Sequence, residues 1–425
     1  MMSNVAGWAW LAFGALWSAL GAVSFFRWTG RESVIRVYYD SVALAGSELG
    51  PQVLLIGLAM SLVLLAAGAL KSRAGEAGAV LTMLSAVLLL TSIQRAWNAR
   101  GGFEAALQQT LGTDYRRSIL PQRAALLREQ VSWRDWIRPT DFSLPGIETI
   151  ADIAYGEHGE RNRLDLLRAS DPPPPGSRGR PVLMQMHGGG YMWGRKNQAG
   201  LPLMHLLARR GWIVVTLNYR LAPADRWPSQ LIDAKKAVAW VREHIAAYGG
   251  DSGFIAATGG SAGGNLSTFL ALTPGQRRYQ PGFERADTSI QAAVPFYAGY
   301  SNEKIDLNDR LSRHTYDNIL PVESRDDPTV QADLIPQTHI QAAAPPFFIL
   351  SGTHDALARI EETREFVSRL RAASRTPVVF AAAQGANHGF DDVHSVRAEH
   401  AANAVQRFLE FVYSDHLRRQ SRTVP

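Results

Sequence analysis

Three long uncharged runs open the chain, and they constrain its fold more than any other feature. They cover residues 5–26, 53–70 and 77–93. The hydrocarbon core of a bilayer is about 30 Å thick, and an apolar helix of roughly 17–25 residues crosses it. All three runs have that length, and Trp8 and Trp28 near the ends of the first run suit a membrane interface. We therefore predict a bundle of three transmembrane helices within residues 1–93.

Two other interpretations account for part of this pattern. The first run is too long for the apolar segment of a signal peptide, and no basic residue precedes it. The second and third runs are short enough to be buried helices of a soluble domain. Three such runs within the first 93 residues favour the membrane. None contains an ionisable residue of the kind that transporters use, so we expect an anchor rather than a pump.

The placement of basic residues predicts the orientation of these spans. Three spans put the loop 27–50 and everything after residue 93 on one side of the membrane. Five basic residues lie close to the membrane on that side and two on the other: Arg27, Arg31, Arg36, Arg95 and Arg100 against Lys71 and Arg73. Loops rich in lysine and arginine stay in the cytoplasm. The C-terminal part of this integral membrane protein is thus expected to be cytoplasmic, with membrane lipids among its partners.

Charge and composition exclude several other classes of function. The formal charge is +6, but the sequence has no recognition module and no clustered basic face with aromatic residues, so we expect no nucleic-acid partner. The absence of cysteine rules out disulfides, a thiol nucleophile and a cysteine-bound metal. Residues 94–146 mix arginines with tryptophans. They are either an amphipathic segment on anionic headgroups that contributes to a cap, or a helical linker with solvated charges.

From residue 147 to residue 425 the pattern becomes that of an α/β catalytic domain. Strands are expected at 147–155, 163–168, 181–187, 212–219, 254–258, 290–297, 346–351 and 377–381, and helices at 199–210, 229–248, 262–272, 358–373 and 395–413. This alternation predicts a mostly parallel sheet with helices on both faces. The proline-rich stretch 170–181 is expected to be a surface connection. Residues 298–340 interrupt the alternation, either as a cap insertion near the site or as an inert insertion.

The stretch TGGSAGGNLS, residues 258–267, places Ser261 between an expected strand and an expected helix. It fits the pattern G-x-S-x-G, in which Gly259 and Gly263 flank the serine. In a strand–turn–helix context this pattern forms a nucleophile elbow, where small residues let the strand and the helix crowd together. The sequence therefore predicts that Ser261 is a catalytic nucleophile.

A serine nucleophile needs a base and an acid that orients the base. His388 follows the last expected strand, and Asp355 follows the strand 346–351. The chain order Ser261, Asp355, His388 is that of an α/β-hydrolase. His354 is a rival for the base. His394 and His400 are expected at the surface, and without an H-E-x-x-H pattern we predict no metal site and no cofactor.

The oxyanion of such a reaction needs backbone donors. The stretch MHGGGYMWG, residues 186–194, follows the strand 181–187, and its glycines allow N–H groups to approach a developing negative charge. We assign the donors to Gly189, Gly190 and the N–H of Ala262, with His187 and Gly188 as further motif residues. A phosphate-binding loop is the alternative, but the sequence has no G-x-x-x-x-G-K-[ST].

Five motifs together resemble one family. They are HGGGYMWG (187–194), NYRLAPADRWPSQLIDAKKAVAWV (218–241), GGSAGGNL (259–266), GTHDAL (352–357) and GANHGFDD (385–392). They look like the hormone-sensitive-lipase-like carboxylesterases, which have the α/β-hydrolase fold, and in particular the membrane-associated esterases of actinobacteria. The resemblance extends over about residues 147–415. Gly260 departs from the family, since many members have an acidic residue before the serine.

The resemblance and the motifs together imply a membrane-anchored serine carboxylesterase or lipase that forms an acyl-enzyme from a small-molecule or lipid ester. One alternative is an acyltransferase or deacylase that acts on a lipid or glycan alcohol, because the motifs do not separate transfer from hydrolysis. A non-catalytic ligand-binding relative is a second alternative, which the presence of all three triad residues disfavours.

Overall fold

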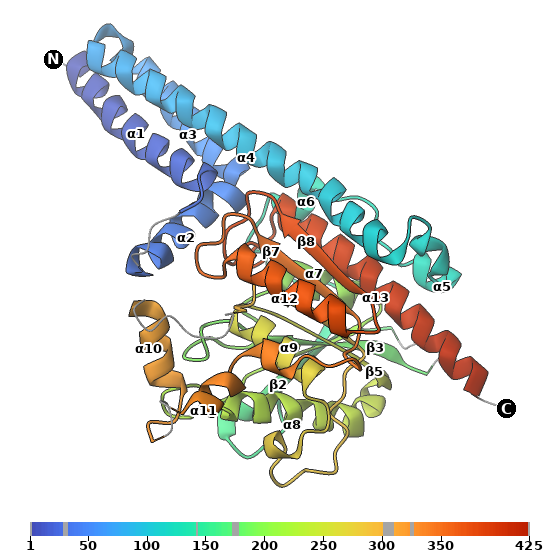
Figure 1. The fold of residues 1–425 in the computed structure, drawn as a ribbon. Coiled ribbons are helices and arrows are strands. Elements are labelled where there is room, and N and C mark those ends of the chain that lie inside the picture. The colour runs from blue at the N-terminus through green and yellow to red at the C-terminus, as the bar shows by residue number, and fades with distance from the viewer. Residues whose placement is uncertain are drawn as a thin grey trace.

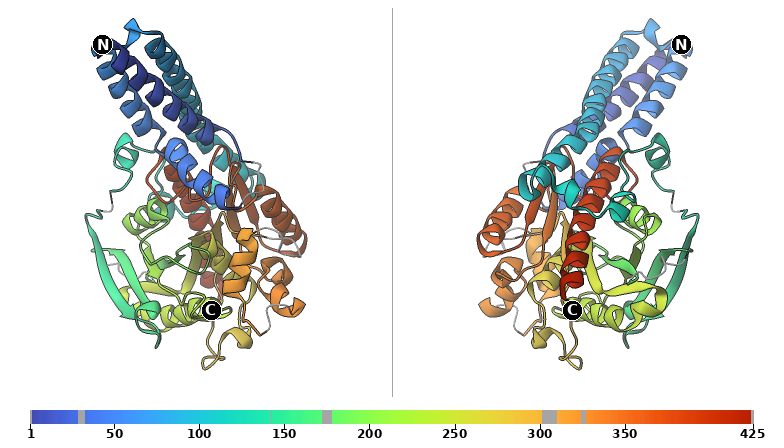
Figure 2. Two further views of the ribbon diagram at one scale, coloured as in Figure 1. Left: turned by 90° about the vertical axis from the view of Figure 1, so that its left-hand side faces the viewer. Right: turned by 90° about the vertical axis from the view of Figure 1, so that its right-hand side faces the viewer.

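The computed structural model describes residues 2–28, 33–141, 143–171, 178–300, 310–323 and 327–423. Figure 1 shows a bundle of long helices at the N-terminus and an α/β domain that carries the C-terminus. The two views of Figure 2 show the bundle rising from one end of this domain, with the N-terminus at its far tip. Part of the proline-rich stretch 170–181 and parts of the insertion 298–340 lie outside the described residues.

Four helices make up most of the N-terminal part. They are α1 (Met2–Phe25), α2 (Ser33–Glu48), α3 (Gly50–Ala66) and α4 (Arg73–Leu111), with the 3₁₀ helix η1 (Ala69–Lys71) before α4. Small residues line the contact between α1 and α4: a Cβ added at Gly14 would lie 2.5 Å from the carbonyl oxygen of Gly78, and one at Gly21 2.9 Å from the Ser85 hydroxyl. Such stripes let membrane helices approach closely.

By length and composition, two or three helical segments are candidate membrane spans among the described residues. Residues 3–25 and helix α4 are each long and apolar enough to cross a bilayer, whereas α3 passes the same test only together with the end of α2, from which an 80° bend separates it. The structure therefore supports an apolar N-terminal bundle, and the third span stays a prediction. Helix α4 runs through residue 93 without a break, so the expected domain boundary there lies inside a helix.

An eight-stranded sheet forms the core of the α/β domain. Its strands are β1 (Ile147–Ala154), β2 (Arg163–Ala169), β3 (Arg180–Met186), β4 (Ile213–Leu217), β5 (Gly250–Gly260), β6 (Ala292–Phe296), β7 (Phe347–Gly352) and β8 (Val378–Ala383). The order is β1-β2-β4-β3-β5-β6-β7-β8, with antiparallel pairing only at β1–β2 and β2–β4. The predicted mostly parallel sheet is confirmed.

Helices cover both faces of the sheet. They are α7 (Leu201–Arg209), α8 (Ser229–His244), α9 (Ala262–Leu272), α12 (Ile360–Ala373) and α13 (Val396–Thr423). Side chains of α8, α9 and α12 share one hydrophobic core, and those of α7, α13 and the end of α4 share the other. The shorter helices are α5 (Pro121–Ala124), α6 (Trp133–Trp136), α10 (Arg310–Ile319) and α11 (Pro328–Asp333), with 3₁₀ turns at Tyr115–Ser118, Gly159–Asn162, Ile245–Tyr248, Arg277–Tyr279 and Pro336–His339.

The segment after the bundle belongs structurally to the α/β domain. Phe103 and Leu107 of α4 are buried in the core that includes α13. Arg123 forms a two-bond ion pair with the buried carboxylate of Glu410, at 2.6 and 2.7 Å. Arg128 pairs with the buried Glu399 at 2.6 Å. These charges face partners on α13 rather than solvent, so this part of the expected linker is docked.

Candidate active site

Ser261 lies on a strained turn between β5 and α9. Its φ and ψ are 56° and −119°, in a region that residues with a side chain rarely occupy. The turn is held from behind, because the Ser261 N–H donates to the carbonyl oxygen of Phe296 on β6 at 3.0 Å. Strain of this kind persists only where the surrounding structure enforces it, and it is concentrated at functional sites.

The glycines around Ser261 allow this turn. A Cβ at Gly259 or Gly263 would overlap the carbonyl oxygen of Met186 at the end of β3, and a Cβ at Gly260 would overlap the phenol of Tyr297. Each position therefore excludes a side chain because a neighbouring strand or ring lies against it. The requirement for small residues in the motif has a specific packing cause at each of the three positions.

Asp355 and His388 meet at the carboxyl ends of β7 and β8. The Nδ1 of His388 lies 2.9 Å from the Oδ2 of Asp355. The other carboxylate oxygen accepts the N–H groups of Leu357 and Ala358 at 2.8 and 2.7 Å, so the fully buried Asp355 is fixed by its own turn. With Nδ1–H donating to the carboxylate, Nε2 is left as the basic nitrogen.

The surroundings of His388 favour its protonated form. Burial lowers the pKa of the imidazole, but the charge of Asp355 and the hydrogen bond to it, with Asp40 and Asp392, outweigh burial and raise the pKa above its ordinary value. Negative charge around a base stabilises the imidazolium that forms when the base takes a proton.

Tyr297 connects the two sides of the site. Its ring centroid is 4.7 Å from that of His388, and its hydroxyl lies beside Gly260, the residue before Ser261. Among the described residues, the Ser261 hydroxyl forms no hydrogen bond with His388. Serine–histidine contacts are often long in free enzymes and tighten when a substrate is bound. The structure thus brings Asp355 and His388 together directly, and Tyr297 contacts both His388 and the residue before Ser261.

The glycine loop after β3 lies beside the serine. A Cβ at Gly188 would lie 3.4 Å from the Cβ of Ser261. Gly189 and Gly190 have φ values of 108° and 55°. Within the part of the chain that the structure describes, the N–H groups of Gly189, Gly190 and Ala262 donate to no other residue. These three groups are therefore available to an oxyanion.

His187 braces this loop. Its ring stacks on Tyr219 at 4.2 Å, and the Tyr219 hydroxyl donates to the His187 carbonyl at 2.7 Å. Its Nδ1 lies 2.7 Å from the Gly188 carbonyl, and burial lowers its pKa to about 4. A neutral ring with Nδ1–H as the donor fits these contacts.

Several known proteins that are similar to this chain are esterases. Residues 172–370 match the BD-FAE family. A probable carboxylic ester hydrolase, LipM, of Mycobacterium tuberculosis is 46% identical over 271 residues, which are 62% of this chain and 61% of LipM. Esterase LipQ of the same organism is 39% identical over 271 residues, 62% of each chain. The α/β domain thus resembles the hormone-sensitive-lipase-like carboxylesterases, as its motifs predict.

A crystal structure shows the same fold at greater evolutionary distance. Esterase B from Lactobacillus rhamnosis, inhibited by a tributyrin phosphonate, has a TM-score of 0.55 and 19% identity, covering 68% of this chain and 93% of that one. The matched regions span about three fifths of the lengths of LipM and LipQ. The family resemblance predicted from the motifs is confirmed for the α/β domain.

The departure from the family at Gly260 has a structural counterpart. The space that an acidic side chain would need there is filled by Tyr297, whose hydroxyl donates to Asp391. Asp391 and Asp392 follow His388 closely in the sequence, and burial raises the pKa of both carboxyls. The loop that carries His388 thus places acidic side chains near Tyr297, which lies against Gly260. No sequence motif marked Tyr297 as a residue of this site.

Two histidines that were expected at the surface are buried. His394 and His400 were expected at the surface, but they are 8% and 5% exposed, because α13 packs against the α4 segment and α7. His394 lies between His205, at 3.1 Å, and Glu399. His354, the rival base, has no partner for its buried Nδ1 among the described residues. The contact with Asp355 therefore favours His388 as the base.

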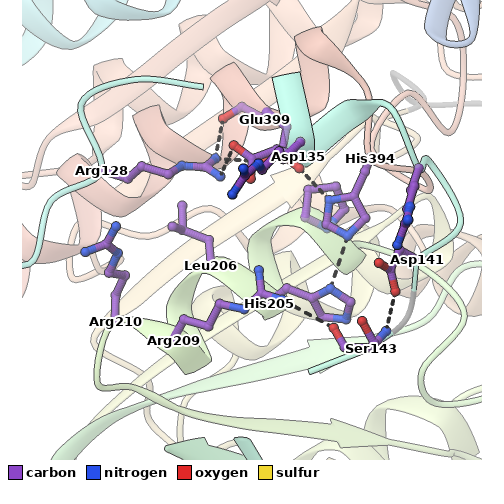
Figure 3. A pocket seen from close by; sticks show the side chains of 13 residues that line it. Arg128, Asp135, Asp141, Ser143, His205, Leu206, Arg209, Arg210, His394 and Glu399 are labelled. Atoms are coloured by element: carbon purple, nitrogen blue, oxygen red, sulfur yellow. Dashed lines mark hydrogen bonds and ion pairs between the residues drawn. The ribbon is translucent and has the colours of Figure 1, made fainter. Parts of the chain in front are cut away.

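A separate pocket of about 250 Å³ lies between α6, α7 and α13. Its lining includes five arginines and three carboxylates: Arg128, Arg134, Arg138, Arg209, Arg210, Asp135, Asp141 and Glu399. Figure 3 shows Arg209 and Arg210 on one wall and the ion pair of Arg128 with Glu399 on another. No triad residue lines this pocket. It is therefore separate from the candidate active site, and its arginines give it a basic rim.

Sequence reasoning missed α2 entirely. The residues between the first two apolar runs were expected to form a loop, but α2 packs against α10 and α13 of the α/β domain. The carboxylate of Asp40, on this helix, accepts the N–H of Ala356 at 3.2 Å, one residue after Asp355. A carboxylate within an otherwise largely apolar stretch was the only signal in the sequence.

Proposed function

We propose that this protein is a serine carboxylesterase that works through an acyl-enzyme. The contact of His388 with Asp355, beside a strained Ser261 and three unpaired N–H groups, carries this proposal. His388 Nε2 takes the proton of the Ser261 hydroxyl as its oxygen attacks the ester carbonyl. The resulting oxyanion is held by the N–H groups of Gly189, Gly190 and Ala262.

In the next steps His388 acts first as an acid and then again as a base. The imidazolium gives its proton to the leaving alkoxide oxygen, so an alcohol departs and Ser261 carries the acyl group. His388 then deprotonates a water that attacks the acyl carbon, and the acid is released as the serine regains a proton. The names of LipM and LipQ, a carboxylic ester hydrolase and an esterase, support this reaction class.

The N-terminal bundle supports an integral membrane location. Large apolar side chains face outward along α3 and the first half of α4, among them Leu55, Leu58, Leu62, Met83 and Leu90. We propose three spans, with the α/β domain on the cytoplasmic side where the arginines gather. Since α2 joins α1 and α3 to the neighbourhood of Asp355, the site lies at the bundle end of the domain. Apolar esters in the bilayer are the substrates that this placement favours.

Aromatic and basic side chains at the base of α3 support contact with lipid headgroups. Gln52, near the start of α3, donates to the carbonyl of Trp136 at 2.9 Å. Trp97, Trp133 and Ile137 are exposed close by. Arg134 and Arg138, which line the separate pocket, are also exposed. Tryptophan and arginine together suit the interface of an anionic membrane.

The decisive experiment uses the full chain in detergent. We expect hydrolysis of a short p-nitrophenyl ester to fall on the order of 10⁴–10⁶-fold in kcat in Ser261→Ala. A fluorophosphonate probe is expected to label the native protein and not the variant. Activity of the variant within tenfold of the native protein would contradict the assignment. A panel of esters of increasing acyl length then defines the substrate class.

A further inference from the structure

Helix α2 is fastened to the α/β domain by buried polar contacts around the catalytic acid and base. Glu48 forms an ion pair with Arg397, and both side chains are fully buried. The same carboxylate accepts a hydrogen bond from the hydroxyl of Ser395 at 2.7 Å. The hydroxyl oxygen of Ser47 accepts a hydrogen bond at 3.2 Å from the side-chain amide of Asn387, the residue before His388. The end of α2 is therefore locked onto the segments 387–397.

Asp40, two helical turns earlier, lies on the other flank of the same site. Its side chain is buried, and one oxygen accepts the Ala356 N–H at 3.2 Å. The backbone N–H of His388 interacts with the same carboxylate. The other oxygen, Oδ1, has no partner among the described residues. A buried carboxylate left half satisfied costs stability, and such groups are concentrated at functional sites.

The charged groups around Asp40 indicate which residues it interacts with. Asp355 and His388 are the charged neighbours that affect it, the first by repulsion and the second by attraction. Burial, with the repulsion from Asp355, raises the pKa of Asp40 to about 7. Asp391 and Asp392 also interact with His388, and Arg27 acts on Asp355 from the end of α1. Among these charged side chains around Asp355 and His388, Asp40 is the one that lies on α2.

We propose that α2 is part of the catalytic site and that Asp40 is a positioning residue, whose carboxylate holds the backbone beside Asp355 and stabilises the imidazolium form of His388. The proposal rests on the proposed esterase function. Negative charge next to an imidazolium strengthens in a buried site, where the effective dielectric constant is low. The N-terminal region thereby contributes to chemistry as well as to anchoring, because the helix between its first two apolar segments carries this carboxylate.

The test compares Asp40→Asn with the native full-length protein in detergent, using a short soluble ester. The amide keeps the size of the side chain and an acceptor for Ala356 and removes the charge. We expect kcat to fall about tenfold at pH 8–9 with KM changed by less than about twofold, because the lost interaction is made mainly when His388 is charged. Asp114→Asn, at an exposed carboxylate of the α4–α5 connection, is the matched control and is expected to behave as native protein.

The pH profile separates an electrostatic role from a purely structural one. His388 acts as a base when neutral, so activity rises with pH through its pKa. Removing a negative neighbour lowers that pKa, so the rise is expected at lower pH in Asp40→Asn. An unchanged kcat would overturn the proposal, and so would a lower kcat with an unmoved profile, which indicates a structural role alone.

Two further measurements keep the result interpretable. Complete labelling by the fluorophosphonate at long times, with a native melting temperature, is expected to show that Asp40→Asn is folded with an intact serine. If Asp40→Asn does not fold, the pH profile of Asp40→Glu decides, because glutamate keeps the negative charge. A rise of activity at the native pH supports the proposal, and a rise displaced to lower pH contradicts it. Activity that survives in Ser261→Ala contradicts the esterase function itself, whereas an inactive Ser261→Ala beside a native-like Asp40→Asn contradicts only the role of Asp40.

Discussion

The N-terminal region makes two kinds of contact that differ in chemistry. Helices α1 and α4 meet through glycines and small polar side chains, with hydrogen bonds such as that of Trp10 to Thr82 at 3.2 Å. Helix α2 meets the α/β domain through the buried pair of Glu48 with Arg397 and through Asp40. The first contact resembles those between membrane helices, where close approach drives association. The second places charges where only specific partners can compensate them.

This difference separates the proposed anchoring role from the proposed catalytic role within one region. Close packing of small residues between α1 and α4 needs space for the two backbones but places no charge that must meet a partner. Buried carboxylates next to a catalytic pair fix one geometry, because any shift leaves a charge without its partner. Perturbing the α1–α4 contact should therefore change the stability of the anchor, and perturbing the α2 contact should change catalysis.

The largest expected effect lies in the catalytic pair against which α2 packs. Asp355→Asn should lower kcat about 10⁴-fold, because the amide favours the wrong tautomer of His388 while the fold is kept. Steady-state kinetics on a p-nitrophenyl ester measure this. Asp391→Asn is the matched comparison, since Asp391 accepts from Tyr297 instead of His388. A large loss of kcat in Asp391→Asn together with a small loss in Asp355→Asn would show that Asp355 is not the acid of the site.

Much of the fold and of the arrangement of the candidate site could be predicted from the sequence, for a physical reason. Parallel strands buried on both faces give continuous apolar runs such as PVLMQMH, and every expected strand overlaps one of β1–β8. The residues of the site follow strand ends, where local patterns are informative. Asp355 and His388 meet because β7 and β8 are neighbours in a parallel sheet.

The contact of α2 could not be predicted in the same way. Asp40 and Ala356 are 316 residues apart, and nothing near either one in the sequence indicates that they meet. The expected linker shows the same limit: Arg123 and Arg128 have the pattern of a solvated helix, but their partners are buried carboxylates on α13. Because these segments belong to the fold of the domain, the role of the proposed anchor is best tested with point variants of the full chain.

The buried ion pair of α2 should be the next most sensitive feature. Arg397→Met leaves Glu48 buried without its partner, which typically costs about 3–5 kcal/mol. Thermal unfolding of the detergent-solubilised protein is expected to show a clear loss of stability. The double variant Glu48→Leu with Arg397→Met should recover most of it, since apolar replacement of both partners is often neutral. Failure of the double variant to recover would mean that other contacts, such as Ser395 with Glu48, carry the interface.

The smallest effect on catalysis is expected from the contact between α1 and α4. A Cβ at Gly78 would lie 2.5 Å from the carbonyl carbon of Trp10, so Gly78→Val forces the two helices apart. Overpacking of this kind typically costs about 1–3 kcal/mol, which should appear as a lower melting temperature in detergent. Hydrolysis of a soluble ester should change by less than about threefold, because the strain lies in the bundle and α2 keeps its own contacts with the α/β domain. Gly101→Val, on the same helix with nothing within 4 Å of the added Cβ, controls for the valine itself. A loss of kcat in Gly78→Val as large as that expected for Asp40→Asn would show that the bundle transmits its packing to the active site, and the separation between anchoring and catalysis would not hold.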